Sequence, residues 1–156
     1  MCAYAATIGE LHILSATGHG AKEEQDRTLF LHPIHAWKLF RVSALARRAH
    51  VLILEKGIEV VSAQDPFEHG LAALRAVQGT SAKLHIQVHT DFLSPWFVKS
   101  GNWRSPHVRM PFLNRIRRRF ADRVLPSAHG IRSVSERVKA SLVAHYGSRI
   151  TILCLD

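Results

Sequence analysis

The stretch EVVSAQDPFEHGLAALRAVQGTSAKLHIQVHTDF, residues 59–92, decides the fold. Two short runs within it, 59–63 and 83–88, have the length and the β-branched and apolar content of β-strands. Residues 70–78 between them have the apolar spacing of a short helix, and Gly79 follows that helix. Strand, helix and strand within about thirty residues form a βαβ unit. The two strands are therefore expected to be parallel neighbours joined by a right-handed crossover.

Polar side chains gather just past the last apolar residue of both predicted strands. These side chains are Gln64, Asp65, Glu68, His89, Thr90 and Asp91. Because open α/β sheets bind ligands at the carboxyl ends of their strands, we expect a binding site at this edge. A simpler interpretation stays open here, in which Asp65 and Asp91 only cap helices or solvate loops.

The rest of the chain continues to alternate between strand and helix patterns. Further strands are predicted at 11–16, 28–31, 130–134 and 150–155, and helices at 37–54, 111–125 and 136–146, with the tail of another helix at 1–9. Loops are predicted at 17–26 and 92–110. In the helix 37–54, the side chains of Arg41, Arg47 and Arg48 are expected to face solvent. This alternation predicts an α/β fold with a Rossmann-like, doubly wound parallel sheet in three α/β/α layers, built as one domain of 156 residues.

The charge balance of the chain favours an anionic partner. With 21 Lys and Arg against 12 Asp and Glu, the net charge is +9 and the pI is about 10.4. Nucleic acid, acidic lipid and a phosphorylated substrate are the partner classes that such a balance suits. Cys2 and Cys154 lie at opposite ends and outside any CxxC pair, so a reducing, cytoplasmic location is expected.

Membrane spans, metal sites and phosphate loops are not predicted. No apolar run approaches the roughly 20 residues of a membrane span, so any membrane contact is expected to be peripheral, on the inner face. His32 and His35 are separated by a proline and a second residue and have no Cys or acid at ligand spacing. The chain also lacks a GxxxxGK[ST] loop.

One segment carries most of the positive charge. Residues 96–123 contain eight Lys and Arg and one acid, so +7 of the net +9 lies there. Phe112, Ile116 and Phe120 recur every four residues and predict an apolar stripe that packs on the sheet. The arginines beside it are predicted to contact an anionic membrane surface or another anion. They are Arg115, Arg117, Arg118 and Arg119.

Three runs of the sequence, taken in order, resemble one known family. VSAQDPFE at 61–68, HTDF at 89–92 and AHGIRSVSE at 128–136 are similar to the acceptor-side domain of family 4 glycosyltransferases, which have the GT-B fold. The third run resembles that family's a-D-G-I-R-V-V-S-E join between a strand and a helix. The resemblance extends from about Glu10 to the last residue. It implies that residues 1–156 are an N-terminal Rossmann-like domain, the acceptor-binding half of a hexosyltransferase.

The chain departs from the family pattern in two places. The family has a first strand with a Gly-rich turn, which stands in the middle of its sheet, and residues 1–9 cannot supply it. The second Rossmann domain, with its Glu-x7-Glu donor motif, is also missing from the 156 residues. The domain is therefore expected to be incomplete, with a vacant central strand position. A nucleotide sugar is expected as co-substrate of the full enzyme, no cofactor is expected on this piece, and this piece alone is expected to be inactive.

The resemblance also implies roles for individual residues. His89 takes the place of a histidine near the donor, where it could bond a sugar hydroxyl or neutralise charge at the leaving phosphate. Asp65 takes the place of an acid facing the acceptor, where it could orient or deprotonate the attacking hydroxyl. Secondary contacts to the acceptor are expected from Gln64, Glu68, Thr90, Asp91 and Ser135, the last of which also suits a helix N-cap. No flanking pair of carboxylates is evident, so the stereochemical mechanism stays open.

Two other functions remain as alternatives at this point. The first is a basic module that binds nucleic acid or another anionic surface through its arginine-rich helix. No nucleic-acid motif is present and the aromatic residues cluster in one loop, which makes nucleic acid the weaker prediction. The second alternative is an inactive, truncated gene product.

Overall fold

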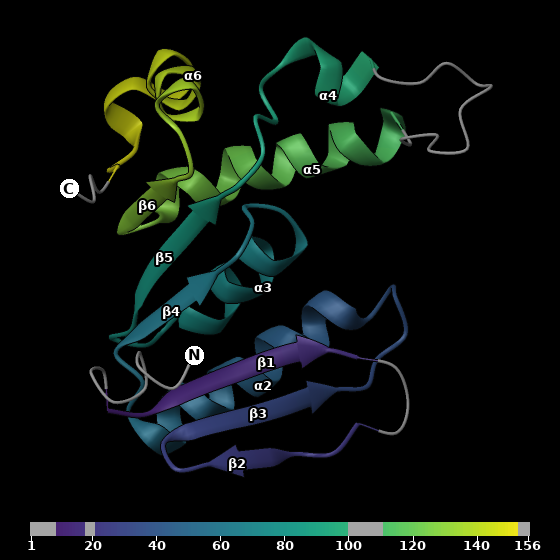
Figure 1. Cartoon of the computed structure of the whole chain (residues 1–156), viewed down its shortest axis with the longest axis vertical. Helices are drawn as coiled ribbons and strands as arrows, with labels where there is room; N and C mark the ends of the chain where they lie inside the picture. Colours follow the sequence, from purple (N-terminus) through teal and green to yellow (C-terminus); the bar gives the residue numbers. More distant parts are fainter. Residues whose placement is uncertain (1–8, 18–20, 100–110, 153–156) are drawn as a thin grey trace.

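The structure, a computed structural model, describes residues 9–17, 21–99 and 111–152 (Figure 1). Its strands are β1 (Leu11–Ala16), β2 (Glu24–Asp26), β3 (Leu29–Ile34), β4 (Val60–Ala63), β5 (Lys83–Val88) and β6 (Gly130–Ser133). Its α-helices are α2 (Arg41–Lys56), α3 (Glu68–Val77), α4 (Pro95–Lys99), α5 (Pro111–Val124) and α6 (Glu136–Tyr146). Single 3-10 turns at Leu125–Ser127 and Gly147–Arg149 follow α5 and α6. The predicted α/β class is confirmed, with a parallel sheet consistent with a Rossmann-like three-layer domain.

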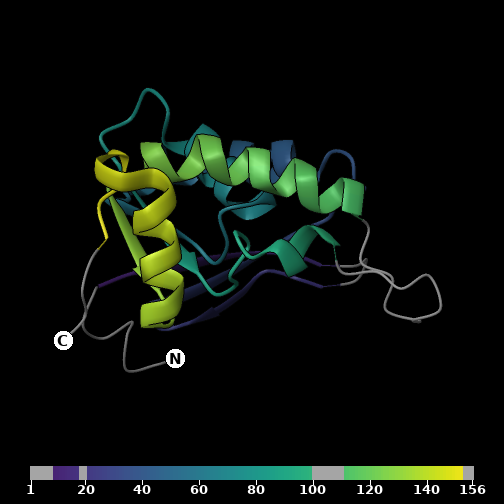
Figure 2. The same cartoon turned by 90° about the horizontal axis from the view of Figure 1, so that it is seen from above.

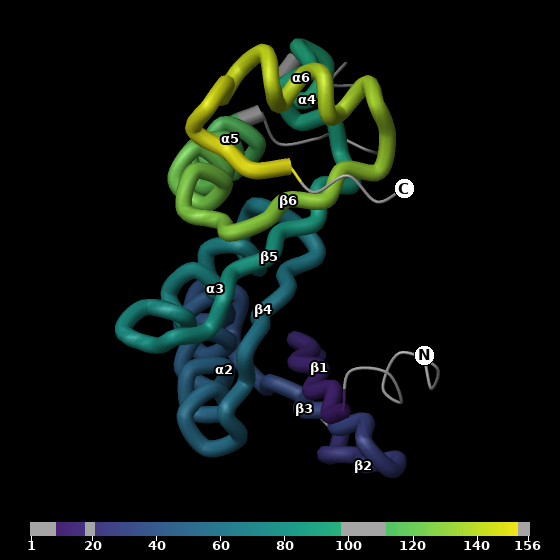
Figure 3. The backbone as a smooth tube through the Cα atoms, turned by 90° about the vertical axis from the view of Figure 1, so that its left-hand side faces the viewer, coloured from purple at the N-terminus to yellow at the C-terminus, as the bar shows by residue number. Residues whose placement is uncertain are grey.

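The strands form two sheets instead of one continuous sheet. In the first sheet β1 pairs parallel with β3, and β3 pairs antiparallel with β2. The second sheet is parallel throughout, in the order β4-β5-β6. Over the residues that the structure describes, no hydrogen-bonded ladder joins β1 to β4. These two strands are edge strands of different sheets, and Figure 3 shows the two sheets apart from each other. The vacant central strand position that the family resemblance implies stays a prediction.

The predicted βαβ unit is the centre of the second sheet. β4 and β5 are parallel, with Val60 opposite Lys83 and Ala63 opposite Ile86, and α3 connects them. Along β5, Leu84, Ile86 and Val88 are fully buried (0% exposed), whereas Lys83 is exposed and His85 and Gln87 are only partly buried. This alternation gives β5 one apolar face, which packs under the helices and forms the main core.

Helices α2 and α3 span the two sheets from one side (Figures 2 and 3). Leu45 and Ala46 of α2 form a buried cluster with Ala72 of α3, and Leu14 and Ile34 of the first sheet pack against that cluster. The first sheet is therefore attached to the rest of the molecule mainly through α2. A small residue at position 72 lets the two helices approach closely.

The arginine-rich turns of α2 are less exposed than predicted. The guanidinium of Arg48 donates to Glu23 at 3.2 Å and also lies 3.4 Å from the ring of His32, which is buried. The expectation that Arg48 simply faces solvent is therefore wrong, because the loop preceding β2 folds over it. Arg47 is exposed as expected.

The start of α2 also differs from the prediction. The helix begins at Arg41, because residues 37–40 form a turn in which the Phe40 N–H donates to the Trp37 carbonyl at 2.9 Å. Trp37 and Leu39 are 78% and 85% exposed, so their apolar character marks a surface and not a core. At the other end Gly57 adopts a left-handed conformation (φ 63°) and ends the helix, as predicted.

Some predicted segments fall partly or wholly outside the described residues. Of the predicted helix tail at 1–9, only Gly9 is among the described residues. Residues 100–110 of the predicted long loop and 153–155 of the predicted last strand also lie outside them. The described part of that loop contains α4, and Ile152 forms a parallel bridge with Ile131 of β6. The strand β2 was not predicted, because its exposed EQD sequence has no apolar alternation. None of the described helices combines the length and hydrophobicity needed to cross a bilayer.

Candidate active site at the carboxyl edge of the sheets

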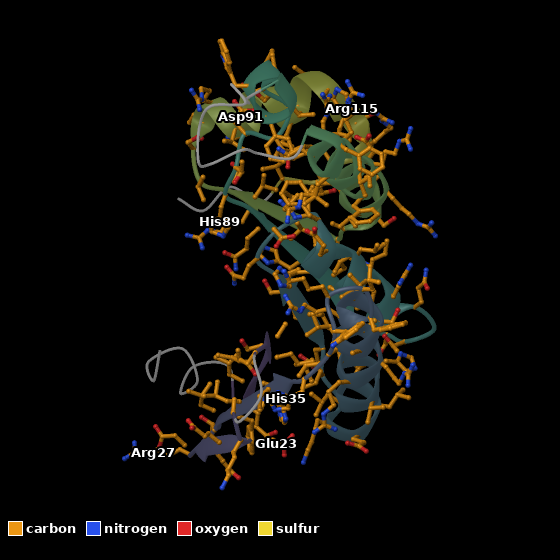
Figure 4. The ribbon with its side chains drawn as sticks, turned by 90° about the vertical axis from the view of Figure 1, so that its right-hand side faces the viewer. Glu23, Arg27, His35, His89, Asp91 and Arg115 are labelled. Carbon is orange, nitrogen blue, oxygen red and sulfur yellow. The ribbon has the colours of Figure 1, made fainter. Side chains whose placement is uncertain are left out.

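Asp65 and His89 follow two strands that lie side by side. β4 ends at Ala63 and β5 at Val88, and the two strands are parallel, so both residues lie at the same edge of the second sheet. Figure 4 looks onto the carboxyl ends of the strands, where His89 comes into view. The side chain of His89 is exposed, whereas that of Asp65 is 27% exposed. The prediction that these residues end neighbouring parallel strands is confirmed.

Asp65 is bonded to a histidine that the sequence interpretation did not single out. Its Oδ1 accepts a hydrogen bond from the backbone N–H of Phe67 at 2.8 Å, and its Oδ2 makes a short contact with Nδ1 of His69. His69 lies in the first turn of α3, four residues after Asp65. Its side chain is 53% exposed, so the imidazole is accessible to solvent.

The two groups shift each other's protonation. Burial alone would raise the pKa of the Asp65 carboxyl, but the hydrogen bond and positive charge of His69, together with the Phe67 N–H, hold this pKa below its ordinary value. The hydrogen bond to Asp65 raises the pKa of His69, against a smaller opposing effect of desolvation. The arrangement is that of a carboxylate that orients an imidazole and stabilises its protonated form.

Gly70 lets α3 begin against the carbonyl of Asp65. A Cβ at position 70 would stand 2.7 Å from the backbone oxygen of Asp65 and 3.0 Å from a methyl group of Val124 in α5. Real side chains do not make contacts this short with backbone atoms, so any larger residue would displace the loop. The absence of a side chain at position 70 therefore allows α3 to pack closely against the backbone of Asp65.

Glu68 is engaged by an arginine of α5. Arg117 donates its Nε–H to both carboxylate oxygens of Glu68, at 2.9 and 3.2 Å, and its guanidinium lies 5.9 Å from the centre of the Phe67 ring. Phe67 in turn stacks on Phe97 at 5.6 Å. The ion pair of Glu68 and Arg117 thus connects α3 to α5. The sequence did not predict this pair, because Glu68 was expected to contact the acceptor and Arg117 to contact an anionic surface.

The remaining predicted acceptor residues are spread along the same edge. Asp91 follows β5 and is mostly buried; its Oδ2 lies 3.7 Å from Nε of Arg137, while its Oδ1 is buried with no partner in the described part of the chain. Ser135 accepts a hydrogen bond from the N–H of Val138 at 3.3 Å, so the predicted helix cap is confirmed. Gln64 and Thr90 are exposed. No group of three metal-ligating side chains converges anywhere in the described ranges.

Helix α5 presents an exposed face that is both basic and aromatic. Arg115 and Arg119 are exposed, Phe112 beside them is 75% exposed, and Arg118 is partly buried. Phe120 packs against the main core, so the predicted apolar stripe is right for Phe120 and wrong for Phe112. In the described part of the chain, Phe112 is not among the side chains that pack against the main core.

Two further residues, His69 and Arg41, carry signals in the sequence that the prediction did not use. His69 stands four residues after Asp65, across the start of a helix, and this spacing brings side chains together. Arg41 follows the exposed turn 37–40, and its Nε is buried rather than solvated. An arginine in the first turn of a helix is unfavourable for the helix dipole, but the helix was predicted to begin at residue 37, so this signal was not used.

A parallel α/β sheet whose polar groups gather at its carboxyl edge defines the class of the molecule as a Rossmann-like ligand-binding domain. The family model described as Glycosyltransferase Family 4 matches residues 4–154. The chain therefore belongs to glycosyltransferase family 4, as its three sequence runs predict. A search of curated proteins gave no match.

Proposed function

We propose that this domain is the acceptor-binding half of a glycosyltransferase that moves a sugar from a nucleotide-sugar donor to an acceptor hydroxyl. Membership of the family supports a transferase activity in the full enzyme. The observation that carries the proposal is the placement of Asp65 and His89 after adjacent parallel strands. A second Rossmann domain would bind the donor and close over this edge from the opposite side.

The geometry suggests separate roles for the two histidines. His69, held by Asp65, would orient the acceptor hydroxyl and take its proton when the imidazole is neutral, while the carboxylate of Asp65 stabilises the resulting imidazolium. His89 is exposed and follows the neighbouring strand, so it can face a donor held by the partner domain. There it would donate to a sugar hydroxyl or to the leaving phosphate.

The test is the substitution His89→Ala in the complete enzyme, which comprises this domain together with a donor-binding domain. Because His89 would contact the transferring sugar or the phosphate, we expect the turnover number to fall by roughly 10²-fold or more. The unfolding midpoint should not change, because His89 is exposed. His145→Ala, at an exposed histidine of α6, is the control. Turnover of His89→Ala equal to that of the control would refute the role.

We further propose that the enzyme contacts an anionic membrane surface from the cytoplasmic side, through the exposed face of α5. Phe112, Arg115 and Arg119 lie on this face, and a basic helix with an exposed aromatic side chain suits the lipid headgroup region. Such a contact would bring the edge of the sheet close to a lipid-linked acceptor. The other predicted arginines serve this contact less well, since Arg117 is bonded to Glu68 and Arg118 is partly buried.

A further inference from the structure

A cavity of about 560 Å³ opens at the carboxyl edge of the first sheet. Thr17 follows β1 directly and His35 follows β3, so the cavity stands at the same kind of edge as Asp65 and His89, but on the other sheet. Figure 4, which faces these strand ends, shows His35 there. The lining residues are Thr17, His35, Ala36, Trp37, Lys38, Leu39 and Arg41.

The charge of this cavity is suited to an anion. Its lining includes the cations Lys38 and Arg41 and no acidic residue, and Nε2 of His35, also in the lining, contacts the Ala21 carbonyl at 3.0 Å. Arg41 is also the first residue of α2, and the first turn of this helix has no acid and receives no side-chain cap from Phe40. The amino end of a 16-residue helix carries partial positive charge, which adds to that of the side chains.

Two buried polar atoms of the lining residues lack partners in the part of the chain that the structure describes. They are the hydroxyl oxygen of Thr17 and Nε of Arg41. A buried guanidinium N–H without an acceptor is unfavourable, and native proteins satisfy nearly all such groups. An oxyanion in the cavity would provide the acceptor that Arg41 lacks.

The apolar part of the lining and the position of Arg41 narrow the choice of ligand. Trp37 is 78% exposed and offers an aromatic face to a sugar or polyol ring. The positive charge of Arg41 acts on His69, where it opposes the rise in the pKa of that imidazole. Arg41 lies in α2 and His69 lies in α3, and these two helices pack on each other through Leu45, Ala46 and Ala72.

We propose that this cavity binds the phosphate group of a phosphorylated acceptor. Arg41 and Lys38 would contact the phosphate oxygens, and Trp37 would pack against the rest of the acceptor molecule. That the phosphorylated ligand is an acceptor substrate rests on the proposed function. That the cavity binds a phosphate group does not. Phosphate as a free monoester and phosphate in a lipid headgroup offer the same oxygens to Arg41, so the two sources are separated by experiment.

The experiment is calorimetric titration of the chain with glycerol 3-phosphate and with glycerol, and sedimentation with vesicles that contain or lack an anionic phospholipid. The variants are Arg41→Ala, Lys38→Ala and, as a charge-matched control, Arg75→Ala, whose side chain is exposed on α3. Arg41→Ala should weaken phosphate binding by roughly tenfold to a hundredfold, Lys38→Ala by a smaller factor, and Arg75→Ala not at all. Because Lys38 is exposed, its variant remains informative if Arg41→Ala fails to fold.

Binding of glycerol 3-phosphate that depends on Arg41 supports a soluble acceptor, and Arg41-dependent binding seen only with anionic vesicles supports a lipid phosphate. Failure to bind either, or an equal loss in Arg75→Ala, overturns the proposal. Binding is measured here without sugar transfer. A phosphate site could therefore be established even if His89→Ala left turnover unchanged, and the two proposals fail separately.

Discussion

Asp65 is held by two donors from its own chain segment, the backbone N–H of Phe67 and the ring of His69. Both donors belong to the start of α3, so the carboxylate is fixed before any ligand binds. A carboxylate that is already fixed loses little further conformational freedom when a ligand binds beside it. The placement of Asp65 after β4 was predictable from the strand pattern. Its bond to His69 was not predicted, because it depends on the path of the backbone between β4 and α3.

The shifted pKa values make a prediction about stability. The pKa of His69 is raised from its ordinary 6.5, so its interaction with Asp65 stabilises the fold fully below pH 6.5 and fades as the pH rises through the folded pKa. The pKa of Asp65 is lowered from 3.8, so its contribution is full above pH 3.8 and is lost as the pH falls through the folded pKa. The pair therefore stabilises the protein most between pH 3.8 and 6.5.

NMR titration of the His69 ring checks this assignment. In the wild-type chain we expect a midpoint above 6.5, and in Asp65→Asn a midpoint closer to 6.5. The difference in melting temperature between these two proteins should be largest inside the stated pH window and should shrink above it. Gln64→Ala, next to Asp65 but exposed, is the control. A midpoint unaffected by Asp65→Asn would contradict the pairing.

At the scale of elements, the βαβ unit was predicted closely because its signals are local. The helix 70–78 was expected and α3 spans Glu68–Val77; the strands were expected at 59–63 and 83–88 and are Val60–Ala63 and Lys83–Val88. The start of α2 was missed because exposed Trp37 and Phe40 mimic the spacing of a buried face. Periodicity identifies an apolar stripe but does not say what covers it.

Helix α5 carries the prediction about membrane contact. Replacing Arg115 and Arg119 together by Ala should weaken binding to anionic vesicles by about 1 kcal/mol per arginine, roughly fivefold each, at low salt. The loss should be smaller at high salt, where screening already weakens the contact. Vesicle sedimentation at two salt concentrations measures both effects.

The matched control replaces Lys56 and Arg75, two exposed cations on α2 and α3. It removes the same charge from other helices and should change vesicle binding less than the α5 variant. Equal losses for both variants, or a loss that does not depend on salt, would count against a specific electrostatic contact of α5.

At the scale of the whole molecule, the sequence could predict the fold class but not the division into two sheets. Strand and helix patterns are read from neighbouring residues, whereas pairing between β1 and β4 depends on what lies between them. In the described residues each of these strands has one unpaired edge, and α2 and α3 hold the two sheets together instead.

The same division explains why part of the site was not predicted. Asp65 and His89 follow strands of one sheet, so the rule for parallel neighbours brings them to one edge. The cavity around Arg41 lies at the edge of the other sheet, and α2, which carries Arg41, packs on α3, which carries His69. Contacts between segments that are far apart in the chain produce no regular residue spacing, so the sequence does not indicate them.

The central claim is that Asp65 and His89 serve one transfer reaction from neighbouring strands, Asp65 through His69 at the acceptor hydroxyl and His89 at the donor. A double-mutant cycle in the complete enzyme tests it most directly, with kcat/KM measured for Asp65→Asn, His89→Ala and the combined variant. Residues that act as a unit have non-additive effects, so the double variant should be impaired little more than the worse single variant. Losses that simply multiply would show two independent residues and would contradict the shared site.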